Sequence, residues 1–338
     1  MILTLQQIKE KLQTTEYDFL RTNPHLGSQI SLLTLGGSYA YGTNNENSDV
    51  DVRGFAMDSK DDILSGEHFD QVIDNPTDTT IYSFNKVVNL WSNCNPNTIE
   101  LLGNAPEKYF ILDRIGKECI DNKELFLSCR AANTFGGYAN AQLQRLNNKA
   151  VRDVPQPEQE EHILNTILYA GDLFAKYGIP EGAIKLFIDD SDNEDLEKEI
   201  YADIRLDHIS LRGFHSAWSE MGSILRSYNK IGKRNSHATE HGKLGKHMMH
   251  LVRLYYMAFD ILEKHEINTY RDAEHDMLLD IRNGAYLDEN NQPVPEFFEL
   301  VNKMEKRLEY DKHNTDLPSK PNYKEIKEFK MAMRQSVL

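Results

Sequence analysis

Two carboxylates separated by one residue, Asp49 and Asp51, alternate with two valines. In a β-strand, successive side chains lie on opposite faces, so both carboxylates would share one face, about 7 Å apart. Val50 and Val52 would then point into a core. Carboxylate oxygens in such an arrangement can bind hard divalent cations. The pattern therefore predicts a metal site that uses Asp49 and Asp51.

A glycine-rich turn precedes these acids by about ten residues. The apolar run 30–35 predicts a buried strand, which ends at Gly36, Gly37 and Ser38. Glycine lets the backbone approach a ligand closely. Backbone N–H groups in such a turn, together with the Ser38 hydroxyl, can hold phosphate oxygens. We therefore expect Gly36, Gly37 and Ser38 to bind the phosphates of a nucleotide.

A third carboxylate is expected at the next predicted strand. Residues 79–84 are rich in β-branched and aromatic side chains, which are typical of a strand. Asp78 stands at the start of this strand. Asp70 and Asp74 are alternatives, but Asp74 adjoins an Asn-Pro turn. The sequence therefore favours Asp78 as the third acid.

A locally basic segment lies later in the chain. Residues 226–253 contain seven Lys or Arg and one acid, whereas the whole chain has a net charge of −15. On a helix that begins at residue 243, the side chains of Lys246, His250 and Arg253 form a stripe separate from an apolar stripe. We expect these three side chains to bind phosphate across a cleft from the acids. A solvated basic face is the alternative.

The combined motifs resemble a known signature. A glycine-serine turn followed after about ten residues by acid-apolar-acid is similar to the DNA polymerase beta-type nucleotidyltransferase superfamily. Further segments resemble one branch, the predicted nucleotidyltransferases found beside RNA-repair ligases. These segments are 78–82 with Lys86, 95–96 with 100–102, 135–139 with Gln142, and 246–254.

The resemblance implies a reaction and its cofactors. Asp49, Asp51 and Asp78 would hold two Mg²⁺ ions, or Mn²⁺, while an NTP donates its nucleoside monophosphate to a hydroxyl and pyrophosphate leaves. An RNA or tRNA 3′ end is the favoured acceptor. The alternatives are a protein-nucleotidylating (AMPylating) enzyme, a catalytically silent nucleotide-binding module of the antitoxin kind, and a metal-dependent phosphohydrolase.

Composition limits the classes further. A net charge of −15 argues against a surface coated with basic groups for duplex nucleic acid. Three cysteines without a Cys-x-x-Cys spacing indicate neither a zinc knuckle nor a disulfide framework, so we expect a cytoplasmic setting. The start of the chain lacks a signal-peptide pattern, and no apolar run predicts a membrane span.

The elements that position these residues predict an α+β fold. We expect a small mixed-sheet nucleotidyltransferase domain over 1–110 and a mostly helical domain over 111–338 that contributes to the substrate cleft. The N-terminal part should carry a helix over 4–21, strands at 30–35, 49–57 and 79–84, and an exposed connection at 58–66. No strand is predicted after about residue 106. Residues 155–157 and 189–199 should be connectors, and both tryptophans should be buried. Helices are expected at 123–146, 158–177, 210–228, 243–264, 273–282, 294–310 and 323–333.

Overall fold

The structure is a computed structural model. It describes residues 2–150, 179–180, 183–190, 198–205, 207–216, 218–219, 243–289 and 293–338. Contacts divide the chain into two compact units. The first comprises Met1–Leu143, Gly245–Asp288 and Pro293–Leu338, and the second comprises Gln144–Leu244 and Glu289–Gln292. None of the helices in the described ranges is long and apolar enough to cross a membrane.

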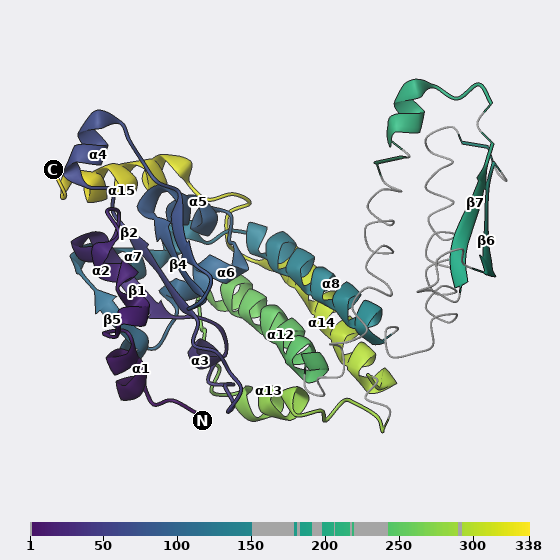
Figure 1. The fold of residues 1–338 in the computed structure, drawn as a ribbon, viewed down its shortest axis with the longest axis horizontal. Coiled ribbons are helices and arrows are strands. Elements are labelled where there is room, and N and C mark those ends of the chain that lie inside the picture. The colour runs from purple at the N-terminus through teal and green to yellow at the C-terminus, as the bar shows by residue number, and fades with distance from the viewer. Residues whose placement is uncertain are drawn as a thin grey trace. The chain divides into compact units, whose positions relative to one another are not determined.

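Five strands of the first unit form one mixed sheet (Figure 1). The strands are β1 (Ile30–Leu35), β2 (Val52–Ala56), β3 (Gln71–Asp74), β4 (Thr79–Ser83) and β5 (Tyr109–Leu112). Their order is β3-β4-β2-β1-β5. β2 runs parallel to β4, and the other neighbouring pairs are antiparallel. The predicted strands at 30–35 and 79–84 are present, and the fold is α+β as predicted.

Helices surround this sheet and continue into a helical bundle. They are α1 (Leu5–Lys11), α2 (Phe19–Thr22), α3 (Gly37–Tyr41), α4 (Lys60–Ser65), α5 (Phe84–Ser92), α6 (Pro96–Ile99), α7 (Arg114–Asp121), α8 (Arg130–Ala150), α12 (Lys243–Phe259), α13 (His275–Arg282), α14 (Pro295–Asn314) and α15 (Tyr323–Gln335). Figure 1 shows α8, α12 and α14 running alongside one another. Leu308 of α14 lies against Gly136 of α8, and Arg307 stacks 4.1 Å from the ring centre of Phe259.

The two faces of the sheet pack against different helices. On one face, Leu33 and Val52 join a core with Ile8 of α1. On the other face, Phe55 contacts Trp91 of α5 edge-on at 5.6 Å. Both tryptophans were expected in the core; Trp91 is fully buried, and its indole N–H donates to the Thr98 carbonyl at 2.9 Å. Burial of large apolar side chains on both faces fixes the sheet and its loops in place.

Several local expectations for the N-terminal part were wrong. The helix expected over 4–21 is broken into α1, a 3₁₀ turn and α2. The connection expected over 58–66 contains α4, because Ser59 and Asp62 form a reciprocal capping box and Gly66 ends the helix at φ 79°. Edge strands β3 and β5 were missed. A four-residue apolar run such as that of β5 does not distinguish a strand from a helix without its pairing partner.

The second unit contradicts the prediction that no strand follows residue 106. β6 (Ile184–Asp190) and β7 (Lys198–Ile204) pair antiparallel in regular register, across part of the segment expected to be a connector. Alternation of apolar residues in both runs was the overlooked signal. Trp218 is 53% exposed, so its expected core position was wrong. The helix expected over 158–177 lies outside the described residues, and 211–216 are helical within the one expected over 210–228.

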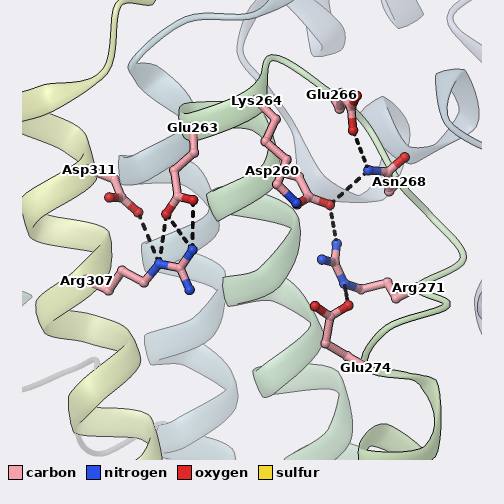
Figure 2. A network of polar contacts seen from close by, with 9 residues as sticks. All are labelled: Asp260, Glu263, Lys264, Glu266, Asn268, Arg271, Glu274, Arg307 and Asp311. Atoms are coloured by element: carbon pink, nitrogen blue, oxygen red, sulfur yellow. Dashed lines mark hydrogen bonds and ion pairs between the residues drawn. The ribbon is translucent and has the colours of Figure 1, made fainter.

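The helix expected over 243–264 changes character near its end, where α12 continues as a π-helical turn, η7 (Asp260–Lys264). Figure 2 shows the buried Asp260 carboxylate between Lys264 and Arg271, at 2.9 and 2.7 Å, with the Asn268 amide at 3.0 Å. These donors lower the pKa of Asp260 against the opposing effect of burial. The turn is therefore held by a fully paired buried carboxylate.

A second ionic cluster joins the same turn to α14. Arg307 donates to both oxygens of Glu263 at 2.8 Å and lies 3.9 Å from Asp311 (Figure 2). Two carboxylates here share one guanidinium. Burial and the neighbouring Glu263 raise the pKa of Asp311 to about 6. The cluster therefore makes the Asp311 carboxyl group harder to ionise than an ordinary aspartate.

Candidate active site

The parallel pairing of β2 with β4 brings two of the predicted acids together. Val52 is opposite Thr79 in this ladder, and the Val52 N–H donates to the Asp78 carbonyl at 3.3 Å. Asp51 and Asp78 immediately precede these paired residues. Asp78 has a φ of 44°, a left-handed conformation that aspartate tolerates better than most side chains. The two carboxyl groups consequently meet beside the first residues of both strands.

The two carboxyl groups share a hydrogen bond. Burial and the hydrogen bond to Asp78 raise the pKa of Asp51 to about 7. The pKa of Asp78 is lowered, chiefly because its carboxylate accepts from Asp51. The Asp51 side chain is 21% exposed and that of Asp78 is 57% exposed. The two carboxyl groups therefore ionise over different pH ranges, as expected for two close carboxyl groups.

The glycine turn lies directly against Asp51. The Gly36 N–H donates to the Asp51 carbonyl at 2.9 Å. Gly37 has a φ of 55°, and a Cβ atom placed on it would be 1.6 Å from the Asp51 Oδ2 atom. Glycine is therefore required at residue 37 for two reasons, the left-handed backbone and the space that Asp51 occupies. Ser38 follows on the first turn of α3 and is 7% exposed.

Arg53 is bonded to both acids. Its Nη2 atom lies 2.9 Å from Asp78 Oδ1 and 3.6 Å from Asp51 Oδ1. Its Nη1 atom donates to the carbonyl groups of Val52 and Asp78. Gly36 leaves room for this side chain, because a Cβ atom there would be 2.8 Å from Arg53 Cγ. The arginine partly neutralises the carboxyl pair and fixes its orientation.

Lys246 is the second cation at this pair. It is exposed on α12, and its charge lowers the pKa of both Asp51 and Asp78. The charge of Lys246 therefore acts on the same carboxyl pair as that of Arg53, but more weakly. The structure thus brings together Asp51, Asp78, Gly36 and Gly37.

Asp49 lies apart from this group. The strand expected over 49–57 begins only at Val52, where pairing with β1 starts, so Asp49 and Asp51 do not share a regular strand face. Asp49 is exposed. The described ranges contain no group of three or more His, Cys, Asp or Glu side chains that could hold a metal ion. The three-acid cluster predicted from the sequence is therefore not assembled in this structure.

The two competing acids have local roles. Asp74 accepts hydrogen bonds from the backbone N–H and the hydroxyl of Thr77, at 3.1 and 2.7 Å, and closes the turn before β4. Asp70 forms an exposed ion pair with Lys86 at 3.4 Å. Within the described residues, neither Asp70 nor Asp74 forms a hydrogen bond or ion pair with Asp51. Of the three candidate acids, Asp78 is the one that lies beside Asp51.

Arg253 is placed differently from the exposed stripe predicted for it. The side chain is 1% exposed and donates to Glu100 at 3.2 Å, and its guanidinium carbon lies 3.5 Å from the ring centre of Tyr41. The Tyr41 hydroxyl donates to both Glu100 oxygens at 3.0 and 3.1 Å. His250 lies 3.4 Å from Arg253 and is half-buried. The stripe is divided: Lys246 is exposed, whereas Arg253 lies in a buried ionic cluster.

This cluster holds the C-terminal part of α3, the helix that the glycine turn begins. Burial raises the pKa values of both Tyr41 and Glu100. A second contact set lies just beyond, where the buried Lys108 ammonium donates to the Ala40 carbonyl at 2.7 Å. His275 lies 2.9 Å from the Gly42 carbonyl. Both sets link α3 to elements distant in sequence and so fix the turn beside Asp51.

Three residues of the site have partners that local sequence patterns do not indicate: Arg53, Tyr41 and Glu100. Glu100 lies in a segment already singled out, but nothing in the local pattern reports that it is buried. A buried glutamate usually needs a cation, and that partner is 153 residues away.

Comparison with known proteins identifies a family model that matches the chain. Residues 4–175, slightly more than half of the 338 residues, match the family model described as the RNA repair pathway DNA polymerase beta family. The matched range includes the glycine turn, the acids and the whole five-stranded sheet, but not Lys246 or Arg253. No curated protein and no solved structure matches the chain.

Proposed function

The chain belongs to the RNA repair pathway DNA polymerase beta family, and we propose that it transfers a nucleoside monophosphate from an NTP to a hydroxyl group of RNA. Pyrophosphate is the second product. The observation that carries this proposal is the hydrogen-bonded pair of Asp51 and Asp78 against the Gly37 backbone. We place the reaction in the cytoplasm, in keeping with three cysteines that form no disulfide.

A divalent cation fits the carboxyl pair. Mg²⁺ binds through one or two carboxylates together with substrate phosphates and water, and Mn²⁺ accepts the same oxygen ligands. Burial and the neighbouring Asp78 raise the pKa of Asp51 to about 7, and a cation between the two carboxyl groups would favour their ionised forms. Asp51 and Asp78 would therefore be the ligands. When bound, the metal would neutralise phosphate charge and lower the pKa of the attacking hydroxyl.

The other residues of the site would bind and orient the NTP. The backbone of Gly36 and Gly37, with Ser38, would hold the β- and γ-phosphates. Lys246 would neutralise phosphate charge as they approach the acids. Arg253 is assigned a positioning role, since its charge is paired with Glu100 beneath α3.

The experiment that tests this function supplies each α-³²P-labelled NTP to the protein with Mg²⁺, in the presence of total RNA or of total protein. Labelled RNA that disappears with the Asp51→Asn variant supports the proposal, since that change removes one charge and one ligand from the pair. A matched Asp61→Asn variant, on the exposed surface of α4, should label RNA like the wild type.

The remaining candidates give different results in the same assay. A protein-nucleotidylating enzyme labels protein, and a phosphohydrolase consumes NTP without any acceptor. A silent nucleotide-binding module binds NTP and labels nothing. Any of these three outcomes would overturn RNA nucleotidyl transfer as the function.

A further inference from the structure

A groove between α5 and α15 lies apart from the carboxyl pair. It encloses a cavity of about 570 Å³. α5 begins where β4 ends, whereas Asp78 precedes the first residue of β4. The five residues of β4 rise roughly 16 Å, so a full strand separates the start of α5 from the acids. The groove is therefore not part of the site described above.

One wall of the groove carries positive charge. Lys327, Lys330 and Arg334 line it, together with Tyr323. At 100° per residue, these four positions fall within an arc of about 60° on α15. The acids Glu325 and Glu328 of the same helix lie well outside this arc. In a chain with a net charge of −15, the charged residues that this helix turns to the groove are therefore all cations, beside Tyr323 and the apolar Ile326 and Met331.

The opposite wall carries side-chain amides. Asn85 and Asn89 of α5 and Asn93 at its C-cap recur every four residues, so they form one row about 12 Å long. The other side of α5 is apolar, with Val88 and Trp91 in the core. Amides both donate and accept hydrogen bonds. The Asn93 amide already bonds to Arg130 and to the Asn89 carbonyl, so Asn85 and Asn89 are the amides that can bind polar edges of a ligand.

The positive charges are incompletely balanced. Arg334 pairs with the buried Asp58 at 2.8 Å, but its Nε atom is buried without a hydrogen-bond partner. Lys330 is half-buried and forms no ion pair within the part of the chain that the structure describes. Burial and the charge of Arg334 lower the pKa of Lys330. An anion in the groove would relieve this excess of positive charge.

An exposed aromatic ring lies at the rim. Tyr323 is 51% exposed, and the Arg130 guanidinium lies 5.7 Å from its ring centre. Arg130 also donates to Asn93 at 2.6 Å, so a fourth cation joins the two walls. Exposed aromatic rings beside cations are the usual surfaces on which unpaired nucleobases stack.

We propose that the α5–α15 groove binds a short stretch of single-stranded RNA. Phosphates contact Lys327, Lys330 and Arg334, a base stacks on Tyr323, and the amide row contacts base or sugar edges. The inference rests on the proposed function, because RNA is the acceptor there. An acidic peptide would use the cations but not the aromatic ring and the amide row, so the full set of groups favours RNA.

Binding of a fluorescein-labelled, 12-nucleotide single-stranded RNA to the full-length protein tests this site. Fluorescence anisotropy is measured in EDTA, so that turnover cannot contribute. The Lys327→Gln/Lys330→Gln variant should raise Kd about tenfold and reduce the slope of log Kd against log salt by about 1.4, from two lost phosphate contacts. A matched Lys303→Gln/Lys306→Gln variant removes two exposed charges from α14 and should stay within about twofold of wild type.

Stacking is tested separately. Tyr323→Ala should weaken binding by roughly fivefold to tenfold, and Tyr323→Phe should retain wild-type affinity, because the ring is kept. Unlabelled single-stranded RNA should compete far better than poly-glutamate or a mononucleotide. Groove variants that bind RNA like the wild type overturn the inference, as does equal competition by poly-glutamate, which would indicate an acidic protein partner.

The binding readout is independent of catalysis. If no NTP labels RNA but the groove variants lose RNA affinity, the proposed function fails and the groove assignment stands. If RNA is labelled while the groove variants bind normally, the groove assignment fails alone. Thermal melting checks each variant; these exposed or half-exposed substitutions should leave it unchanged.

Discussion

Gly37→Ala is the most informative single substitution, because Gly37 touches Asp51 through its backbone alone. An alanine Cβ would lie 1.6 Å from Asp51 Oδ2, whereas contacts below 3.0 Å essentially do not occur. The carboxylate or the turn must therefore move by more than about 1.4 Å, the difference between these two distances. In addition, the backbone φ of 55° costs alanine about 1–2 kcal/mol.

Displacement and strain have separable consequences. A shift of about 1 Å in a reacting group can cost roughly 10²-fold in rate, so we expect nucleotidyl transfer to fall at least that much. Stability should fall by about 1–2 kcal/mol or more. Gly66→Ala is the matched control, since Gly66 has a φ of 79° and nothing within 4 Å of the added Cβ. It should lose similar stability and keep full activity.

Single-turnover transfer rates and chemical denaturation of both variants check this reasoning. If Gly37→Ala transfers at the wild-type rate with unchanged stability, the close packing of the glycine turn on Asp51 is not the catalytic geometry. If Gly66→Ala loses activity equally, backbone strain acts at a distance and the steric explanation is wrong.

Four further substitutions test other parts of the structure. Asp78→Ala should reduce transfer by several orders of magnitude, whereas Asp74→Ala should keep activity and lose about 1 kcal/mol from its turn, as judged by rates and melting curves. Glu100→Gln should cost about 3–5 kcal/mol in denaturant unfolding, because Arg253 stays buried with its charge unpaired; a loss below about 1 kcal/mol would contradict this. Asp311→Asn should stabilise the protein at pH 7.5 by about 1–3 kcal/mol. The pKa of Asp311 is about 6 in the folded protein, above its ordinary value of 3.8, so the contribution of Asp311 to wild-type stability is full below pH 4 and is lost as the pH rises through 6. Its melting temperature should therefore exceed that of wild type at pH 7.5 and match it near pH 4, and a lower value at pH 7.5 would refute the assignment.

The parts of the fold that sequence could predict are those with local signals. The strand before the glycine turn has an unbroken apolar run, and 79–84 has strong β propensity. On α12, the predicted apolar stripe is buried; it comprises Leu244, Met248, Leu251 and Tyr255. Helical periodicity alone was sufficient there, since one face of the helix packs on the core.

The missed strands depend on distant partners. β5 is four residues long and is defined by pairing with β1, about 75 residues earlier in the chain. Without that partner, its apolar run has no period to distinguish it from part of a helix. The same limit applies to the start of β2. Its pairing with β1 begins only at Val52, so Asp49 and Asp51 do not lie on one regular strand as predicted. A sequence motif carries no information on where pairing begins.

Arg253 shows why a basic residue in a sequence does not by itself indicate a binding site. Helical geometry separates Lys246, His250 and Arg253 from the apolar stripe. It does not predict whether each of these side chains faces solvent or a buried carboxylate. Glu100 lies opposite Arg253 and Asp51 lies near Lys246, so two cations two turns apart on one helix have different partners. The ion pair between Arg253 and Glu100 is buried and therefore stabilises the fold, because an unpaired charge there would be costly. Lys246 is exposed on the same helix, so under the proposed function it would be the cation that meets a phosphate, while Arg253 holds that helix in place.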